Sequence, residues 1–163
     1  AHLMRLDQEL GKLAAHAGSG ATITRALVGE MVGLSREEQA WEVQSAILSG
    51  DPETALVRLR ELLDVSQLPE ILVSWAVGDL VRKLHAASRM LAEGEPSALV
   101  AKTLKLWGPS RDVIMHHAQR LDPNELAKLM GQAVQLDAKT KTGLADPGRA
   151  LEGLTALATE AVG

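Results

Sequence analysis

Apolar residues recur three and four positions apart along most of the chain, a spacing that places them on one face of an α-helix. Residues 50–91 show the pattern most strongly and predict two helices joined by a short turn. The second helix carries apolar residues on more than one stripe, so we expect it to be the central rod of a helical domain, with neighbours on several sides. The residues expected to face the core are Leu56, Leu59 and Leu63 on the first helix and Val73, Val77, Leu80, Leu84 and Leu91 on the second.

Short polar signals mark where the helices begin. Asp51 and Asp122 each precede a proline, which suits the first turn of a helix because its missing N–H costs no hydrogen bond there. Pro69 likewise marks the start of the long helix. The helix openings expected along the chain involve Thr22 or Thr24, Ser35, Asp51, Ser110, Asp122 and Asp146. About nine helices result, and no stretch alternates with the period of two that marks a strand, so the predicted fold class is all-α, a helical bundle.

The shorter helices are also expected to bury one side each. Their predicted inward residues are Ala40, Val43 and Ile47 near residues 35–50, Leu99, Val100, Leu104 and Trp107 near 97–107, and Val113, Ile114, His117 and Leu121 near 110–121. With 163 residues, 46% of them hydrophobic, the chain can form a domain with its own core. The core must be aliphatic, because the chain has three Trp and neither Phe nor Tyr.

Other compositional features narrow the class of protein. The absence of Cys excludes disulfides, cysteine-ligated metals and thiol chemistry. No apolar run is long enough to span a bilayer and no signal peptide is visible, so we expect a cytoplasmic protein without a membrane partner. The net charge of −4 conceals an asymmetry: residues 1–81 hold 6 basic and 12 acidic side chains, whereas residues 82–163 hold 11 basic and 9 acidic ones. A local basic surface in the second half could therefore meet a polyanion.

The sequence offers no pattern typical of catalysis. His116 and His117 are adjacent, so on a helix they point in different directions and cannot share a metal as an i, i+4 pair would. Asp and Glu cluster at helix starts, where capping and the helix dipole explain them. We therefore expect a non-catalytic chain with no metal and no cofactor of its own.

Residues 104–111 contain the one candidate binding site. Trp107 is flanked by Lys105 and Arg111, an arrangement in which the indole could stack on an unpaired base while the cations hold phosphate. The alternative is a core tryptophan that closes a helix end beside two solvated charges. The residue pattern alone favours that alternative, because basic helices are common and nucleic-acid sites are not.

The order of several segments adds a resemblance. The segments, in chain order, are LDQELGKLAAHAG, ITRALVGEMVG, AILSGDPETALVRLRELL, LPEILVSWAVGDLVRKLHAASRM, ALVAKTLKLWGPSRDVI and DAKTKTGLADPGRALEGL. In this order they resemble the delta subunit of the bacterial DNA polymerase III clamp loader, over nearly the whole chain. The lack of Phe and Tyr departs from the family.

The resemblance implies a division of the chain and a role for it. Residues 1–34 are similar to the end of a small helical lid domain, and residues 35–163 to the C-terminal collar through which loader subunits assemble into a ring of five. The family's N-terminal ATPase-like domain, which opens the sliding clamp, lies outside this sequence, so the clamp is expected to be reached only through that domain. The expected partners are the ATPase subunits, which would hold ATP and magnesium, the delta-prime subunit, and primer-template DNA. By motif, Trp107 would lie close to the DNA with Arg111 beside it.

Two other interpretations fit parts of the sequence. GDPETALVRLRELL alone would suit a helical-hairpin scaffold of the tetratricopeptide-like kind, unrelated to replication, although no fixed period recurs as stacked repeats require. Residues 97–121 would loosely suit a helix–turn–helix DNA reader, but Val113 and Ile114 are expected to be buried rather than free to contact bases. The leading prediction is a scaffold within the clamp loader.

Overall fold

The computed structural model describes residues 2–18, 20–25, 27–28 and 36–163. By their internal contacts, the residues form two compact units, 1–38 and 39–163. The described part of the chain contains eight α-helices, one π-helical turn and no strand, which confirms the all-α prediction. The domain boundary predicted between residues 34 and 35 lies outside the described residues.

The first unit contains helix α1, His2–Ala17. Of its leucines, Leu13 is buried, whereas Leu3, Leu6 and Leu10 are exposed. The helix ends before Gly18, whose positive φ of 81° suits glycine and whose N–H donates to the Ala14 carbonyl.

Thr24 caps the following turn as predicted. The Leu27 N–H donates to the Thr24 hydroxyl oxygen at 3.2 Å. Residues 29–35, which include the expected cap Ser35, lie outside the described residues.

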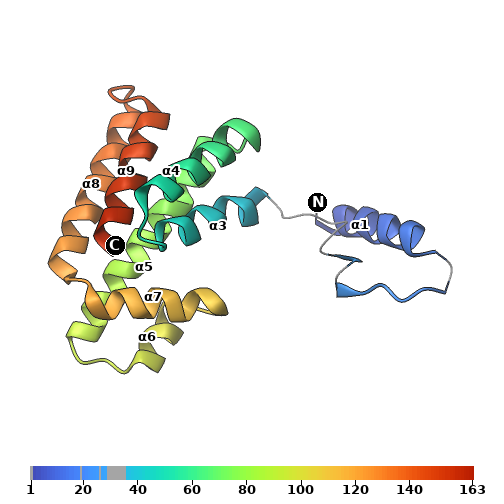
Figure 1. Cartoon of the computed structure of the whole chain (residues 1–163), viewed down its shortest axis with the longest axis horizontal. Coiled ribbons are helices and arrows are strands. Elements are labelled where there is room, and N and C mark those ends of the chain that lie inside the picture. Colours follow the sequence, from blue (N-terminus) through green and yellow to red (C-terminus); the bar gives the residue numbers. More distant parts are fainter. Residues whose placement is uncertain (1, 19, 26, 29–35) are drawn as a thin grey trace. The chain divides into compact units, whose positions relative to one another are not determined.

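The second unit is built from the remaining helices. They are α3 (Arg36–Ile47), α4 (Pro52–Arg60) with the π-helical turn η1 (Glu61–Val65), α5 (Glu70–Ala92), α6 (Ser97–Thr103), α7 (Pro109–Arg120), α8 (Pro123–Lys141) and α9 (Pro147–Val162). In Figure 1, α8 and α9 lie side by side, and α6 and α7 lie near the C-terminal end of α5. The helix lengths vary from 7 to 23 residues, unlike the equal helix pairs of a repeat scaffold.

Helix α5 is the central rod, as predicted. It packs against α6, α7, α8 and α9, and Gln44 of α3 donates a hydrogen bond to its Ala76 carbonyl at 2.7 Å. Four of its predicted core residues, Val73, Val77, Leu80 and Leu84, are at most 1% exposed, and Leu91 is half-buried. Burial of each such side chain contributes about 1.5–3 kcal/mol, so this seam supplies much of the stability of the unit.

Three predicted helix caps, each an Asp followed by Pro, are confirmed. Asp51 accepts hydrogen bonds from the Glu53 and Thr54 amides, and the bond from the Thr54 hydroxyl is the main cause that lowers the pKa of this carboxyl. Asp122 and Asp146 accept from the Asn124 and Arg149 amides in the same way. Each of these helices has its proline in the first turn.

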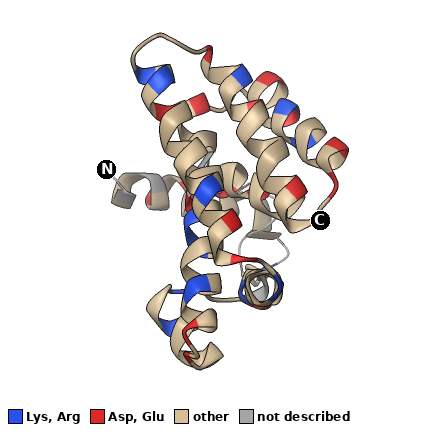
Figure 2. Cartoon of the chain, turned by 90° about the vertical axis from the view of Figure 1, so that its left-hand side faces the viewer, with Lys and Arg blue, Asp and Glu red and all other residues tan. Residues whose placement is uncertain are grey.

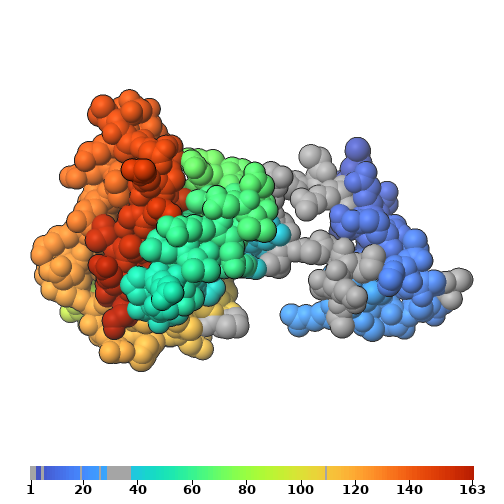
Figure 3. Space-filling view, turned by 45° about the horizontal axis from the view of Figure 1, so that its top comes forward, coloured from blue at the N-terminus to red at the C-terminus, as the bar shows by residue number. Residues whose placement is uncertain are grey.

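The predicted inward face of α4 is only partly right. Leu59 is fully buried, but Leu56 and Leu63 are only half-buried, and the other buried residues are Ala55 and Leu62. One face of α4 packs on α9, as Figure 3 shows where the C-terminal helix runs beside residues 52–60. The small side chain of Ala55 suits a close helix approach, and the π turn that follows α4 changes the periodicity on which the prediction relied.

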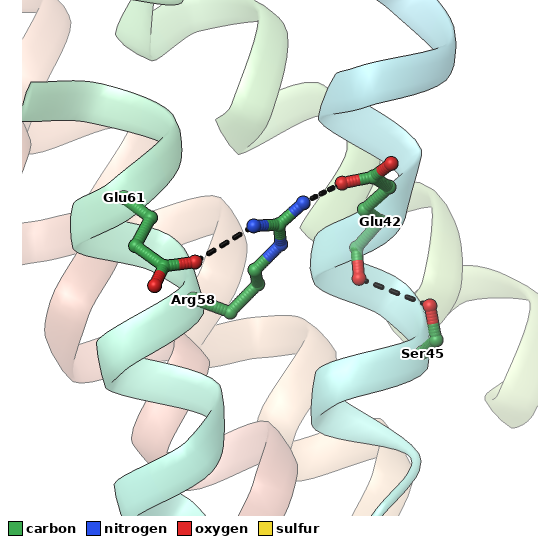
Figure 4. Close-up of polar contacts among 4 residues, drawn as sticks. All are labelled: Glu42, Ser45, Arg58 and Glu61. Atoms are coloured by element: carbon green, nitrogen blue, oxygen red, sulfur yellow. Dashed lines mark hydrogen bonds and ion pairs between the residues drawn. The ribbon is translucent and has the colours of Figure 1, made fainter. Parts of the chain in front are cut away.

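A polar bridge joins α3 to α4 on the surface. Arg58 of α4 donates to Glu61 of η1 at 2.7 Å and to Glu42 of α3 (Figure 4). All three side chains are partly exposed, so this pair of contacts contributes at most about 1 kcal/mol. The burial of the inward residues predicted for α3 attaches this helix to the domain more strongly than the polar bridge does. These residues are Ala40, Val43 and Ile47.

The predictions for α6 and α7 need correction. Val100 and Ile114 are buried, Leu104, His117 and Leu121 are half-buried, and Leu99, Trp107 and Val113 are exposed. Ser110 does not cap α7, because the helix begins one residue earlier at Pro109, with Gly108 at the cap position. The Ser110 hydroxyl instead donates to the Trp107 carbonyl at 3.2 Å. None of the helices in the described ranges is both long and apolar enough to cross a membrane.

Candidate nucleic-acid and partner interfaces

The connection between α6 and α7 is held in a defined conformation. Leu106 is buried, and its N–H donates to the Ala101 carbonyl at 2.9 Å. On either side, Lys105 and Gly108 have positive φ values of 53° and 67°. The buried leucine anchors a sharp reversal of the chain, and this reversal turns the neighbouring side chains away from the core.

Trp107 is therefore a surface residue. Its side chain is 69% exposed, so the core-tryptophan interpretation favoured by the residue pattern is wrong. Lys105 is exposed and has no acidic partner among the described residues. Arg111 is also exposed, on the first turn of α7, where its closest acid is the adjacent Asp112 at 3.9 Å.

Lys105 and Trp107 line a hollow of about 690 Å³. Helix α3 contributes Trp41 and Gln44, and α5 contributes Lys83. Arg111 does not line it, so the structure gathers two of the three predicted site residues around this hollow and places the third beside it.

The Lys83 ammonium is held at the hollow by two groups. It pairs with the Asp79 carboxylate at 2.6 Å and lies over the Trp41 ring, 5.1 Å from the centroid. Arg82 pairs with the same carboxylate. One buried acid with two cations leaves a net positive charge, so this cluster still attracts an anion.

Trp41 and Lys83 could not be identified as site residues from the sequence. Trp41 precedes Trp107 by 66 positions, and the two line the same hollow only because the fold brings α3 beside the connection from α6 into α7. Lys83 does fall in residues 82–163, the half of the chain with the excess of basic side chains.

A second surface, on α5 and α8, is different in chemistry. It contains three large exposed apolar side chains that line the same shallow groove. They are Ile71 (68% exposed) and Trp75 (60%) of α5 and Val134 (62%) of α8. The groove continues between α8 and α9 over Leu136 and Leu154. We call the α5–α8 groove with Ile71, Trp75 and Val134 the apolar face.

Charges at the edge of the apolar face are paired. Asp79 pairs with Arg82, and Asp137 pairs with Lys141 at 2.7 Å. Figure 2 shows blue and red residues interspersed along the helices rather than gathered by sign. This surface therefore offers apolar area beside the Asp79 cluster, which carries one net positive charge, and its other edge charges, Asp137 and Lys141, are paired.

The adjacent histidines of α7 have different surroundings. The rings of His116 and His117 meet edge to face with centroids 5.6 Å apart, and in the described ranges no group of three or more His, Asp and Glu side chains could hold a metal ion. His117 Nε2 lies 3.1 Å from the Leu48 carbonyl oxygen. Burial is the main cause that lowers the pKa of His117, which keeps the ring neutral near pH 7.

Comparison with known proteins gives the family. The profile described as the DNA polymerase III delta subunit, C-terminal domain, matches residues 37–156, which is most of the chain. The chain belongs to the DNA polymerase III delta subunit family. The matched region covers nearly all of the second unit, with both surfaces described above. The tetratricopeptide-like interpretation gains no support.

A solved structure shows the same fold. The DNA clamp loader delta protein of Bacillus subtilis superposes with a TM-score of 0.70 at 23% sequence identity. The alignment covers 98% of this delta-family chain and 47% of the Bacillus protein, so the chain spans about half the length of that protein. No curated protein matches the chain. The comparisons therefore confirm the delta resemblance and the collar-type fold.

Proposed function

We propose that this delta-family chain is an assembly module of a bacterial clamp loader. Residues 1–34 form the end of a lid domain, and residues 35–163 form the collar through which loader subunits associate. The chain fixes the orientation of neighbouring ATPase subunits and of the delta-prime subunit, so that the loader can hold an open sliding clamp over primed DNA. ATP binding and hydrolysis belong to those partners, and contact with the clamp belongs to the family's N-terminal domain.

The apolar face is the observation that carries this proposal. Three large apolar side chains, Ile71, Trp75 and Val134, are each at least 60% exposed on neighbouring helices. A contiguous apolar surface of this kind on a folded domain is typical of a protein–protein interface. The tryptophan suits the centre of such an interface, because large aromatic side chains contribute most to the binding free energy of protein partners.

A contact with primer-template DNA forms the second part of the proposal. Trp107 is exposed on a rigid loop, and Lys105 and Arg111 lie on either side of it in sequence. An exposed indole can stack on an unpaired base, while lysine and arginine contact phosphate. The contribution of this contact to affinity depends on assembly, because the loader positions the DNA.

Size-exclusion chromatography tests the assembly role. The 163-residue chain is mixed, without ATP, with the ATPase subunit and the delta-prime subunit of the same organism's loader. We expect co-elution in a complex. A chain that elutes alone, while full-length delta assembles with the same partners, would contradict a collar role for these residues.

A further inference from the structure

The hollow beside Trp107 is lined in large part by aliphatic side chains. Leu48, Leu106 and Ile114 are buried, and Val113, which is 42% exposed, lines the hollow as well. The volume of about 690 Å³ falls within the range of roughly 300–1,000 Å³ typical of ligand sites. An apolar side chain inserted there would exchange water for aliphatic contacts on several sides, which favours binding.

The neutral polar groups of the hollow are directed to the backbone. The hydroxyl protons of Ser45, Ser49 and Ser110, which all line the hollow, donate to backbone carbonyl oxygens at 3.0, 2.6 and 3.2 Å. A ligand carbonyl that enters deeply would therefore find no hydroxyl donor, and an unpaired buried polar group costs free energy. The inner part of the hollow suits an apolar group.

Two lysines line the same hollow and remain available to an anion. Lys105 is exposed and has no acidic partner among the described residues. Lys83 shares the buried Asp79 carboxylate with Arg82, so this cluster keeps one net positive charge. The Lys83 ammonium also lies over the Trp41 ring, 5.1 Å from its centroid, and this restraint reduces the entropy lost when a carboxylate pairs with it.

An acidic peptide segment offers both kinds of group that this lining suits. A leucine or phenylalanine side chain would pack on the aliphatic residues, while neighbouring aspartate or glutamate side chains pair with the lysines. A polyanion without an apolar group would leave the aliphatic lining unused. A purely apolar segment would cover the ammonium groups without a counter-charge, which costs free energy.

We propose that this hollow docks a short acidic segment of a partner protein, with one large apolar side chain against the aliphatic lining and carboxylates beside Lys83 and Lys105. This goes beyond the assembly role, which uses the apolar face. It also goes beyond the DNA contact, which uses the exposed ring of Trp107. The inferred partner is a protein recognised through a short segment rather than through a folded surface.

Three fluorescein-labelled heptapeptides test the docking site on the 163-residue chain. The first has the sequence Asp-Glu-Leu-Phe-Asp-Glu-Asp. In the second, Gly-Ser replaces Leu-Phe, and in the third, Asn and Gln replace every Asp and Glu. Binding is measured by fluorescence anisotropy at low salt. We expect the first peptide to bind at least about tenfold more tightly than either control, because each control loses one of the two sets of contacts.

Two matched pairs of variants locate the first peptide in the hollow. Val113→Glu places a carboxylate within the lining and should weaken binding by about tenfold or more, whereas Val57→Glu, at an exposed valine outside the hollow, should leave it unchanged. Lys83→Gln removes one ammonium group and should also weaken binding by about tenfold. Its control is Lys128→Gln, which loses an ion pair with Glu125 outside the hollow. Thermal unfolding establishes that each variant is folded.

Three results would overturn the docking site. Equal binding of the first peptide and either control would mean that charge alone, or apolar area alone, explains the binding. Equal losses for Val113→Glu and Val57→Glu would place the peptide elsewhere. Binding of a labelled oligothymidylate but not of the first peptide would assign the hollow to nucleic acid. None of these measurements uses another loader subunit, so failure of the docking site and failure of the assembly role are distinguishable.

Discussion

Two exposed tryptophans lie in different surroundings on the same helical unit. Trp75 is in the middle of α5, where its ring meets Trp41 edge to face with centroids 5.0 Å apart, and it shares a groove with the exposed side chains of Ile71 and Val134. Trp107 is on a loop at a hollow lined by two lysines, and Lys105 has no acidic partner among the described residues. In the proposed function the same side chain serves two classes of partner, because exposed apolar neighbours suit a protein and a lysine without an acidic partner suits a polyanion.

The largest effect should come from charging the apolar face. Ile71→Glu combined with Val134→Glu places two carboxylates where partner apolar area would cover them. We expect association with the other loader subunits to weaken by at least about thirtyfold, in line with the loss of a binding hot spot. Sedimentation or size-exclusion measurements over a concentration series check this.

Val65→Glu is the control for that experiment. Val65 is 78% exposed on the π turn and does not line the α5–α8 groove. It should leave association unchanged, and the double variant should still bind DNA like the unmodified chain. Loss of association in the control as well would mean that added negative charge, rather than the apolar face, is responsible.

The next largest effect should come from the other tryptophan. Trp107→Ala in a reassembled loader should weaken primer-template binding by about 1–3 kcal/mol, because one base loses its stacking partner. Assembly should be unaffected, the reverse of the first experiment. Unchanged DNA affinity at low salt would remove Trp107 from the DNA contact, and Trp107→Phe, which keeps an aromatic ring, should recover most of the lost affinity.

Lys105 allows charge and backbone strain to be separated. A residue other than glycine with φ near 53° is strained by about 1–2 kcal/mol. Glycine relieves this strain but costs about 0.5–1 kcal/mol of stability, because it makes the unfolded chain more flexible. Lys105→Gly should therefore stabilise the fold by about 0.5–1 kcal/mol while it weakens DNA binding. Urea unfolding and anisotropy are measured on the same preparation.

Gln67 provides the comparison for this variant. It has a similar φ of 52° in the turn before α5 and does not line the hollow. Gln67→Gly should change stability in the same direction but not DNA affinity, and Lys105→Gln should weaken DNA binding without stabilising the fold. A DNA effect for Gln67→Gly would show that loop flexibility, not charge, controls binding.

The smallest effect concerns pH. Because burial lowers the pKa of His117, the folded protein binds this proton more weakly than the unfolded chain does, and stability should fall as pH falls through about 6.5. His117→Gln can still donate to the Leu48 carbonyl but cannot be protonated. The difference in Tm between pH 7.5 and pH 5.5 should shrink by on the order of one degree, since the ring is only half-buried. An unchanged difference would mean that other groups cause the acid sensitivity.

Sequence reasoning succeeded where a short stretch decides the structure. Asp51, Asp122 and Asp146 cap helices because their own neighbours donate the hydrogen bonds. The buried seam of α5 followed from periodicity, because a helix surrounded by other helices has apolar residues wherever it is covered. These features depend little on distant residues.

Sequence reasoning failed where contacts between distant parts of the chain determine which side chains are buried. Trp107 looked like a core residue by its spacing, but the buried Leu106 beside it takes that role and turns the indole outward. Ala55 was overlooked because its small side chain gives little apolar signal, although the packing of α9 buries it fully. The walls of the hollow come from three segments, and no pattern within one of them indicates the others.

The packing of α9 on α4 has a consequence for how the protein is made. A Cβ atom on Gly163 would lie 2.7 Å from the Gly50 carbonyl oxygen, and α9 packs on α4 across the same junction. Helices formed early in synthesis therefore keep an uncovered apolar side until residues 147–163 leave the ribosome. Over that interval the nascent chain exposes apolar surface, which favours aggregation until α9 covers it.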